Sequence, residues 1–228
     1  MKLAILQPNF FPYRSYYDLV KKVDKVVFLD DVYYNNKSWV NKTLLKVRSK
    51  DFYFRIPINN YKQLNIKDVK IKNEKWKKNF LKMINLEYKY CPNFSLVFPV
   101  IEEAISLPTD SIAHLSAYSV FKISSLFKDN TEFAFSSIDY PNVKGSIEDK
   151  ILTICKKEKA SIYYSLFKTP YNAEKFLRND IKVSNFVSYE GRCSIMDDLM
   201  TNHSYHHFLE KECNLRQHEQ SRAFEPTE

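Results

Sequence analysis

Two adjacent acidic residues follow an apolar run near the start of the chain. Asp30 and Asp31 come directly after Val26-Val27-Phe28-Leu29, a run that is typical of a buried strand. A carboxylate in this position can act as a general base, bind a metal ion or accept a hydrogen bond from a ligand amine. Adjacent side chains of an extended backbone point to opposite faces, so at most one of the two can face a given cleft. A turn or a helix cap is the simpler alternative, but we favour function because strand-end loops of α/β sheets often carry sites.

Amide side chains stand in the corresponding place after an earlier apolar run. Gln7 and Asn9 follow residues 2–6, and apolar residues then recur at helical spacing over residues 16–23. This order of strand, turn, helix and strand predicts a βαβ unit and a parallel sheet. Ligands of such sheets bind beyond the carboxyl ends of the strands. The sequence therefore predicts one site that is lined by Gln7, Asn9 and the two acids.

The remaining patterns predict an α/β fold whose mostly parallel sheet is opened by this βαβ unit. A β-hairpin over residues 43–58 and the helices after it form an insertion at about residues 40–128. Asp110 is expected to cap a helix, and Ser146 with Asp149 resembles a capping box. Further strands are expected at residues 66–71, 132–136, 161–165 and 182–188, and helices at 75–89, 94–106, 110–128, 147–158 and 171–178.

Length and composition indicate a packed globular protein. The chain has 228 residues, of which 44% are hydrophobic, and we expect a single domain over residues 1–212 and a loose polar tail over 213–228. Its four cysteines lack the spacing of a zinc site or a redox pair. The first apolar run is too short for a signal peptide, and no apolar stretch approaches the ~20 residues that cross a bilayer. We therefore expect a cytoplasmic protein without membrane insertion.

The positive charge is concentrated in one segment. Residues 37–89 hold 15 Lys and Arg against 4 Asp and Glu, an excess of +11 in a chain whose net charge is +8. Such a segment favours an anionic partner, which could be a sugar nucleotide, a cofactor phosphate, RNA or an acidic membrane face. A lysine-rich solvated surface is the alternative. The chain has only 2 glycines, which excludes a glycine-rich phosphate-binding loop.

An indole and an amide stand two residues apart after the acids. If the segment is extended, Trp39 and Asn41 share a face and suit a sugar ring or a base, whereas core packing of Trp39 is the alternative. We further expect substrate contacts from four more residues, which are Tyr13, Lys37, Ser136 and Ser165.

The histidines and nucleophiles give weaker signals. His203 and His207 would share a helical face, but no acid lies between them as in a zinc protease motif, so we expect no metal site. His114 stands alone and is expected to be structural. Ser194 is best explained as a helix cap, because no Gly-x-Ser-x-Gly motif is present, and no cysteine has a convincing catalytic partner.

Three segments near the N-terminus form a specific combined pattern. They are Gln7-Pro8-Asn9-Phe10-Phe11-Pro12-Tyr13, Phe28-Leu29-Asp30-Asp31-Val32 and Lys37-Ser38-Trp39-Val40-Asn41. In order and spacing they resemble the signature of the WbqC-like protein family, which usually runs QPNYLPW, FLDDVQF and SWQNR. The likeness covers residues 2 to about 165 and continues through Trp76, residues 88–94, Ser136-Ser137 and residues 151–155, with a weaker similarity at 194–199. The chain departs from the family at residues 165–171, which lack the usual Ser-Gly-rich stretch, and at 188–193, which lack the usual histidine.

The resemblance implies a transferase in surface polysaccharide synthesis. Family members are tied to O-antigen gene clusters and have been suggested to place an acyl or aminoacyl group on the amino group of a nucleotide-linked deoxyamino sugar. Asp30 or Asp31 would then accept the amine proton, and both Asp→Asn variants are expected to keep their fold. Gln7 and Asn9 would bind the sugar or the acyl carbonyl, Trp39 would stack, and lysines of residues 37–89 would meet the diphosphate. The donor would be an acyl-CoA, a folate or a charged tRNA.

Two other classes of function remain open. The first is a nucleotidylyltransferase-like, adenylate-forming enzyme, although residues 13–16 hold tyrosines where that class has a His-x-x-His motif. It would release pyrophosphate from a nucleoside triphosphate with magnesium. The second is a non-catalytic module that binds RNA or another anion through Lys75, Lys78 and Lys82.

Overall fold

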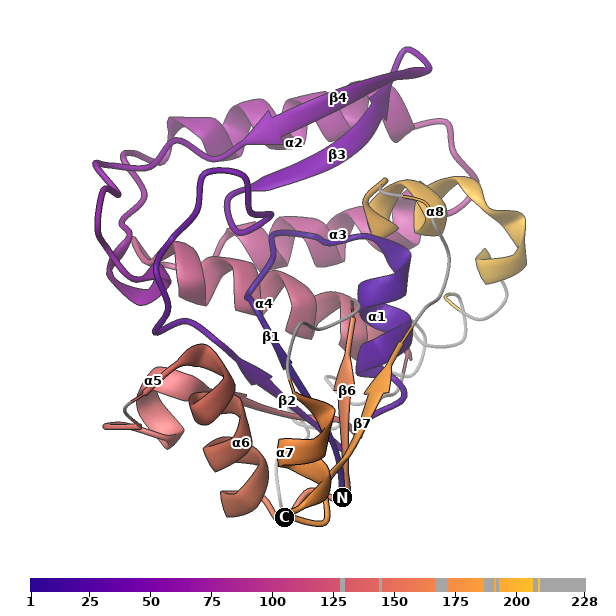
Figure 1. Cartoon of the computed structure of the whole chain (residues 1–228). Coiled ribbons are helices and arrows are strands. Elements are labelled where there is room, and N and C mark those ends of the chain that lie inside the picture. Colours follow the sequence, from indigo (N-terminus) through magenta and orange to yellow (C-terminus); the bar gives the residue numbers. More distant parts are fainter. Residues whose placement is uncertain are drawn as a thin grey trace, which may run out of the picture.

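A computed structural model describes residues 1–127, 130–143, 145–166, 172–186, 191, 193–206 and 209. Its centre is a sheet of five strands in the order β5-β2-β1-β6-β7, and every neighbouring pair is parallel (Figure 1). The predicted α/β class with a mostly parallel sheet is confirmed. The strands are β1 (Lys2–Leu6), β2 (Lys25–Phe28), β5 (Glu132–Phe135), β6 (Ile162–Ser165) and β7 (Lys182–Asn185).

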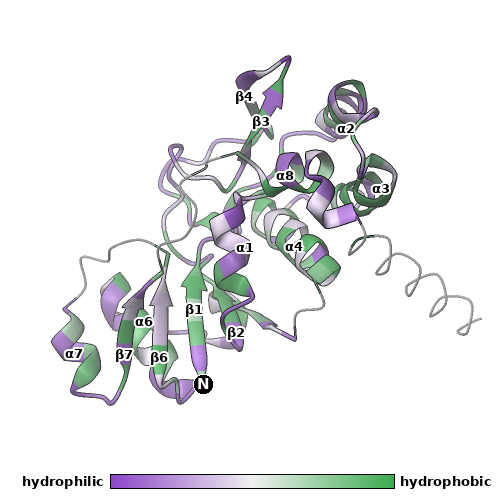
Figure 2. Ribbon diagram, turned by 90° about the vertical axis from the view of Figure 1, so that its right-hand side faces the viewer, coloured by the Kyte–Doolittle hydropathy of each residue, from purple (hydrophilic) through white to green (hydrophobic). Residues whose placement is uncertain are grey.

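The strand order reverses at the middle of the sheet. The chain first adds β2 and β5 on one side of β1, and it then returns to add β6 and β7 on the other side. In doubly wound sheets the ligand crevice lies beyond the carboxyl ends at such a reversal, which here falls between β1 and β6. The arrowheads of β1, β6 and β7 point toward the part of the molecule that holds α8 and the two-stranded sheet (Figure 2).

Alternate residues of the strands feed two apolar layers. Leu3 and Ile5 pack with α6 (Ile147–Lys157) and α7 (Ala173–Leu177), whereas Ala4 and Leu6 face α1 (Arg14–Val20) and α4 (Ile112–Ser124). Helices therefore cover both faces, which explains why the central strands β1 and β2 are continuous apolar runs rather than alternating ones.

The insertion between β2 and β5 holds the predicted hairpin and helices. Strands β3 (Lys42–Val47) and β4 (Lys50–Arg55) pair antiparallel, and α2 (Lys75–Tyr88), α3 (Phe94–Ile105) and α4 follow. The remaining helical segments are α5 (Ser136–Asp139), α8 (Ile195–Thr201) and the 3-10 turns η1 (Ile66–Asp68), η2 (Ser125–Phe127) and η3 (His203–Tyr205).

Two local expectations in the insertion are wrong. Residues Ile66–Asp68 form a 3-10 turn rather than a strand, because Ile66 and Val69 are buried at a spacing of three, which suits a turn. The cap of α4 is Ser111, whose Oγ accepts the His114 N–H, while the Asp110 carboxylate pairs with Lys70. The expected capping box at Ser146 is confirmed, and Ser194 caps α8.

An aromatic cluster fastens the loop after β1 to the insertion. Phe80 of α2 lies 5.5 Å from Phe10, 6.1 Å from Phe11 and 4.6 Å from Phe54 of β4, measured between ring centroids. Trp76 contacts the same group, and all of these rings except that of Phe54 are fully or almost fully buried. The hairpin and α2 are therefore held against residues 7–13.

The backbone of Phe11 is clamped by three hydroxyl groups. Its φ of 39° lies in the left-handed region, which is rare for an aromatic residue. Its N–H donates to Ser119 Oγ at 3.0 Å, and its carbonyl accepts from Thr43 Oγ1 at 2.9 Å and from Ser194 Oγ at 2.8 Å. These donors and acceptors come from α4, β3 and the cap of α8, so distant parts of the chain fix this loop.

Some expectations fall outside the described residues. The strand expected at 182–188 is confirmed up to Asn185, whereas residues 187–190 and the expected tail at 213–228 are not described. Among the helices that are described, none combines the length and apolar character needed to span a bilayer.

Candidate functional site

Asp30 is completely buried where β2 and β5 end side by side. Phe28 pairs with Phe135, so the residues after each strand meet. The Asp30 carboxylate accepts hydrogen bonds from Ser136 Oγ at 3.0 Å, from Ser137 N at 3.0 Å and from Ser137 Oγ at 2.6 Å. With three donors, this carboxylate positions α5 against β2 and offers little free acceptor capacity.

Asp31 contacts the same serine hydroxyl as Asp30 but keeps partial access to solvent. Its side chain is 15% exposed, and its Oδ2 lies 2.5 Å from Nζ of Lys150, a residue of α6 that is 12% exposed. Its Oδ1 accepts from Ser136 Oγ at 2.6 Å. The single hydroxyl proton of Ser136 is therefore shared between two carboxylates, and of the pair only Asp31 is open to a ligand.

Asn9 has a buried oxygen without a partner in the described part of the chain. The residue is 9% exposed, and its Oδ1 makes no hydrogen bond there. Leaving such an acceptor unsatisfied costs about 1–3 kcal/mol. Gln7 is half-buried, and its main-chain carbonyl accepts a hydrogen bond from the Tyr16 hydroxyl. Ser165 is buried at the end of β6. Gln7, Asn9 and Ser165 thus flank the reversal of strand order.

Trp39 and Asn41 do not share a face, and that expectation is wrong. Residues 36–41 form turns rather than an extended segment. The Asn41 amide is buried, with Oδ1 accepting from Tyr34 Oη at 2.8 Å and Nδ2 donating to Ile56 O at 3.0 Å, so it braces the hairpin. Trp39 is half-buried, and its ring lies 6.0 Å from that of Tyr13, edge to face. Lys37 is exposed and offers its carbonyl to Lys42 Nζ.

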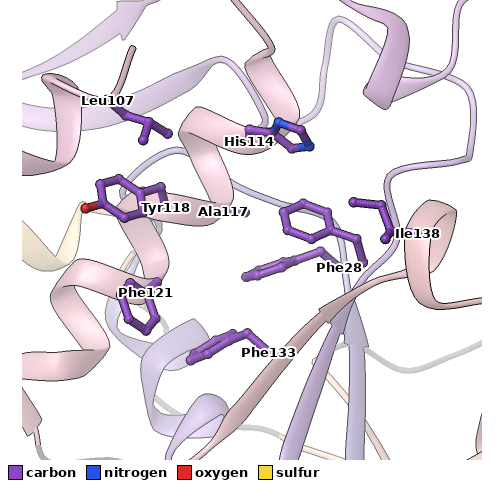
Figure 3. Close-up of a pocket in the computed structure, with 9 residues that line it drawn as sticks. Phe28, Leu107, His114, Ala117, Tyr118, Phe121, Phe133 and Ile138 are labelled. Carbon is purple, nitrogen blue, oxygen red and sulfur yellow. The ribbon is translucent and has the colours of Figure 1, made fainter. Parts of the chain in front are cut away.

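An apolar pocket of about 530 Å³ lies between α4 and the edge strand β5 (Figure 3). Phe28, two residues before Asp30, and Phe135, directly before Ser136, line it. His114, expected to be structural, is exposed and lines the pocket, with its ring 5.2 Å from that of Phe135. The other lining residues are Leu107, Ala117, Tyr118, Phe121, Phe133 and Ile138.

Metal and thiol chemistry find little support in the described residues. They contain no group of three or more His, Cys, Asp or Glu side chains that could hold a metal ion. His206 Nδ1 lies 2.8 Å from Asn93 Oδ1, and His207 is outside the described residues. Burial raises the pKa of the Cys155 and Cys193 thiols to about 12, so neither forms a thiolate at neutral pH.

Sequence reasoning missed Lys150 and Ser137. Lys150 lies four residues before the buried Ile154 and so adjoins the apolar face of α6, but a lysine at the edge of such a face is common and marks no site. Ser137 entered the sequence analysis only as part of the family resemblance at Ser136-Ser137, because its contact with Asp30 depends on the meeting of two strands about one hundred residues apart in sequence.

Replacement of Asp30 by Asn is expected to destabilise the fold by about 2–3 kcal/mol, because an amide NH₂ would face donors that now bind a carboxylate. Urea denaturation of both proteins measures this difference. This adds a loss of stability to the expectation that the Asp30→Asn variant keeps its fold. An unchanged midpoint would show that the Asp30 network carries no stability.

Comparisons with known proteins agree with the pattern of motifs. The family model described as the WbqC-like protein family matches residues 7–200. A Mycobacterium tuberculosis protein (strain ATCC 25618 / H37Rv), named "Uncharacterized protein Rv1507c", is 23% identical over 167 residues, which cover 72% of this chain and 71% of that protein. No solved structure matches the chain.

Proposed function

The chain belongs to the WbqC-like protein family, and from that premise we propose that it is a transferase of surface polysaccharide synthesis. It would place an acyl or aminoacyl group on the amino group of a nucleotide-linked deoxyamino sugar, in the cytoplasm, for O-antigen or capsule. The observation that carries this proposal is the pair of Asp31 and Lys150 at the carboxyl end of β2, partly open to solvent and braced by Ser136.

The pair offers the two charges that acyl transfer to an amine requires. A neutral amine must lose a proton when it attacks, and Asp31 is the accessible carboxylate of the two strand-end acids. The attacked carbonyl oxygen becomes negative in the transition state, and the Lys150 ammonium can stabilise that charge. Asp30 supports the pair as a positioning residue, through Ser136 and Ser137.

The proposed step conserves atoms and charge. The sugar nitrogen forms a bond to the acyl carbon, and the bond from that carbon to the donor's sulfur or oxygen breaks. The amine proton passes to Asp31 and from there to the leaving group, which restores the carboxylate. Acyl-CoA and charged tRNA both fit this scheme, since CoA leaves as a thiol and the tRNA leaves with a free hydroxyl.

The site around β1 suits the sugar part of such a substrate. Gln7, Asn9 and Ser165 flank the reversal of strand order, where doubly wound sheets bind ligands. The same strand order favours a nucleotidylyltransferase-like enzyme as the second candidate. That alternative differs in needing a nucleoside triphosphate and magnesium and in releasing pyrophosphate.

A ligand screen followed by a transfer assay tests the proposal. We expect UDP- and dTDP-linked amino sugars to raise the melting temperature, because a ligand at one hundred times its Kd stabilises a protein by about 2.7 kcal/mol. Incubation of the bound sugar with acetyl-CoA or glycyl-tRNA should then give an amide, detected by mass spectrometry. The same sugars with a hydroxyl in place of the amine are the control. Pyrophosphate release from ATP without amide formation would contradict the transferase and favour the second candidate.

A further inference from the structure

The hairpin holds a buried cation without an acidic partner. Lys42 is 8% exposed, its Nζ donates to the Lys37 carbonyl at 2.8 Å, and no carboxylate of the described residues lies within ion-pair distance of it. The residue directly opposite on β4 is Arg55, a second cation. Like charges that face each other across a strand pair are destabilising. Burial and the Arg55 charge both lower the pKa of Lys42. Packing of the hairpin alone does not explain this arrangement.

Two flat aromatic rings lie beside Lys42. Lys42 Nζ is 5.3 Å from the centre of the Trp39 ring and 6.0 Å from that of Tyr53. The rings of Trp39 and Tyr53 are 5.9 Å apart, and Tyr53 is 47% exposed. Tyr53 and Arg55 alternate with Phe54, which packs on Phe80. The rings and the cations therefore share the face of the hairpin that is turned away from the aromatic core.

This face adjoins the loop after β1. The main-chain oxygen of Trp39 accepts from the Phe10 N–H at 3.0 Å, and the Trp39 ring contacts Tyr13. Residues 7–13 lead from β1 into α1, next to the point where the strand order reverses. A ligand on the hairpin face would thus extend toward the carboxyl ends of the sheet.

We propose that Lys42, Arg55, Trp39 and Tyr53 form a binding site for a nucleoside diphosphate. The two cations neutralise the diphosphate, which Arg can contact with two parallel hydrogen bonds. The rings stack on the base, a contact that tolerates different bases. One stacking pair with two cations matches a single nucleotide rather than a longer strand. The site rests on the proposed function in one respect, that the diphosphate belongs to the sugar nucleotide.

Tryptophan fluorescence measures this binding directly. The chain has two tryptophans, and Trp76 is buried in the core, so quenching by UDP or ADP reports Trp39. We expect Lys42→Met and Arg55→Gln each to weaken binding at least tenfold. The melting temperature of ligand-free Lys42→Met should stay unchanged or rise, because an uncompensated buried charge is removed. Lys50→Gln, an exposed change on the same hairpin, is the matched control and should bind as the parent does.

Four results would overturn the site. The first is no quenching by either nucleotide at millimolar concentration, and the second is an affinity of both cation variants equal to that of the parent. The third is a lower melting temperature of Lys42→Met, which indicates a structural role. The fourth is binding of a single-stranded RNA that UDP does not displace. The assay needs no acyl donor. Nucleotide binding without amide formation would support this binding site and contradict the proposed transferase activity. Amide formation by Lys42→Met with an unchanged KM for the sugar nucleotide would support the transferase activity and contradict this binding site.

Discussion

Asp31→Asn is expected to lower the rate of amide formation by about 10²–10⁴-fold, the usual contribution of a positioned general base. An amide cannot accept the amine proton, but it can still accept the hydrogen bond from Ser136. The fold should survive, because Asp31 is partly open to solvent and an Asn side chain has nearly the same shape as Asp. Steady-state rates at saturating sugar nucleotide, together with a thermal melt, measure both effects. The loss should appear in kcat rather than in KM, since the proton leaves during the chemical step.

Two further variants make this expectation specific. Lys150→Met removes the other half of the pair and should also lower kcat, whereas Asp51→Asn removes an exposed carboxylate of the hairpin, paired with Lys46, and should leave the rate unchanged. If Asp31→Asn transfers at the parent's rate, the pair of Asp31 and Lys150 is structural and the chemistry lies elsewhere.

Phe80→Ala is expected to destabilise the protein by about 3–5 kcal/mol, the cost of removing a fully buried aromatic ring from a packed core. Its ring touches those of Phe10, Phe11 and Phe54, so the cavity would open between α2, the hairpin and the loop after β1. Because that loop carries Gln7 and Asn9, binding of sugar nucleotides should weaken as well. Urea denaturation followed by circular dichroism measures the free energy of unfolding.

The matched control lies on the same helix. Leu86 is 61% exposed, and Leu86→Ala should change the free energy of unfolding by less than about 0.5 kcal/mol. A loss for Phe80→Ala close to that of Leu86→Ala would mean that the aromatic cluster does not hold the insertion in place.

Most of the fold was predictable because its elements have strong local patterns. The βαβ opening, the hairpin and the long helices follow from apolar runs and spacing, and Ser146 with Asp149 marked a helix start. Ile66 and Val69 misled because a buried 3-10 turn and a short strand can show the same few apolar residues. Asp110 misled because Ser111, one residue later, is an equally good cap.

The candidate site was predictable only in part. Parallel strands bring their ends to one edge, so the meeting of Asp30 with Ser136 follows from topology once β2 and β5 are neighbours. No local pattern gives the side chain that α6 presents to Asp31, and for that reason Lys150 was missed. Trp39 and Asn41 were assigned to one face on the assumption of an extended backbone, and turns at residues 36–41 separate them. Contacts between residues far apart in the sequence therefore determine where these side chains lie.

The hydrogen bonds that hold the Phe11 peptide have a consequence for the order in which the protein folds. Its hydroxyl partners lie 32, 108 and 183 residues further along the chain. The loop around Phe11 therefore acquires its full set of contacts only after Ser194 has been synthesised and has docked. A C-terminally shortened copy could build the parallel strands and still lack the shaped loop at their tips, so ligand recognition should be among the first properties that truncation removes.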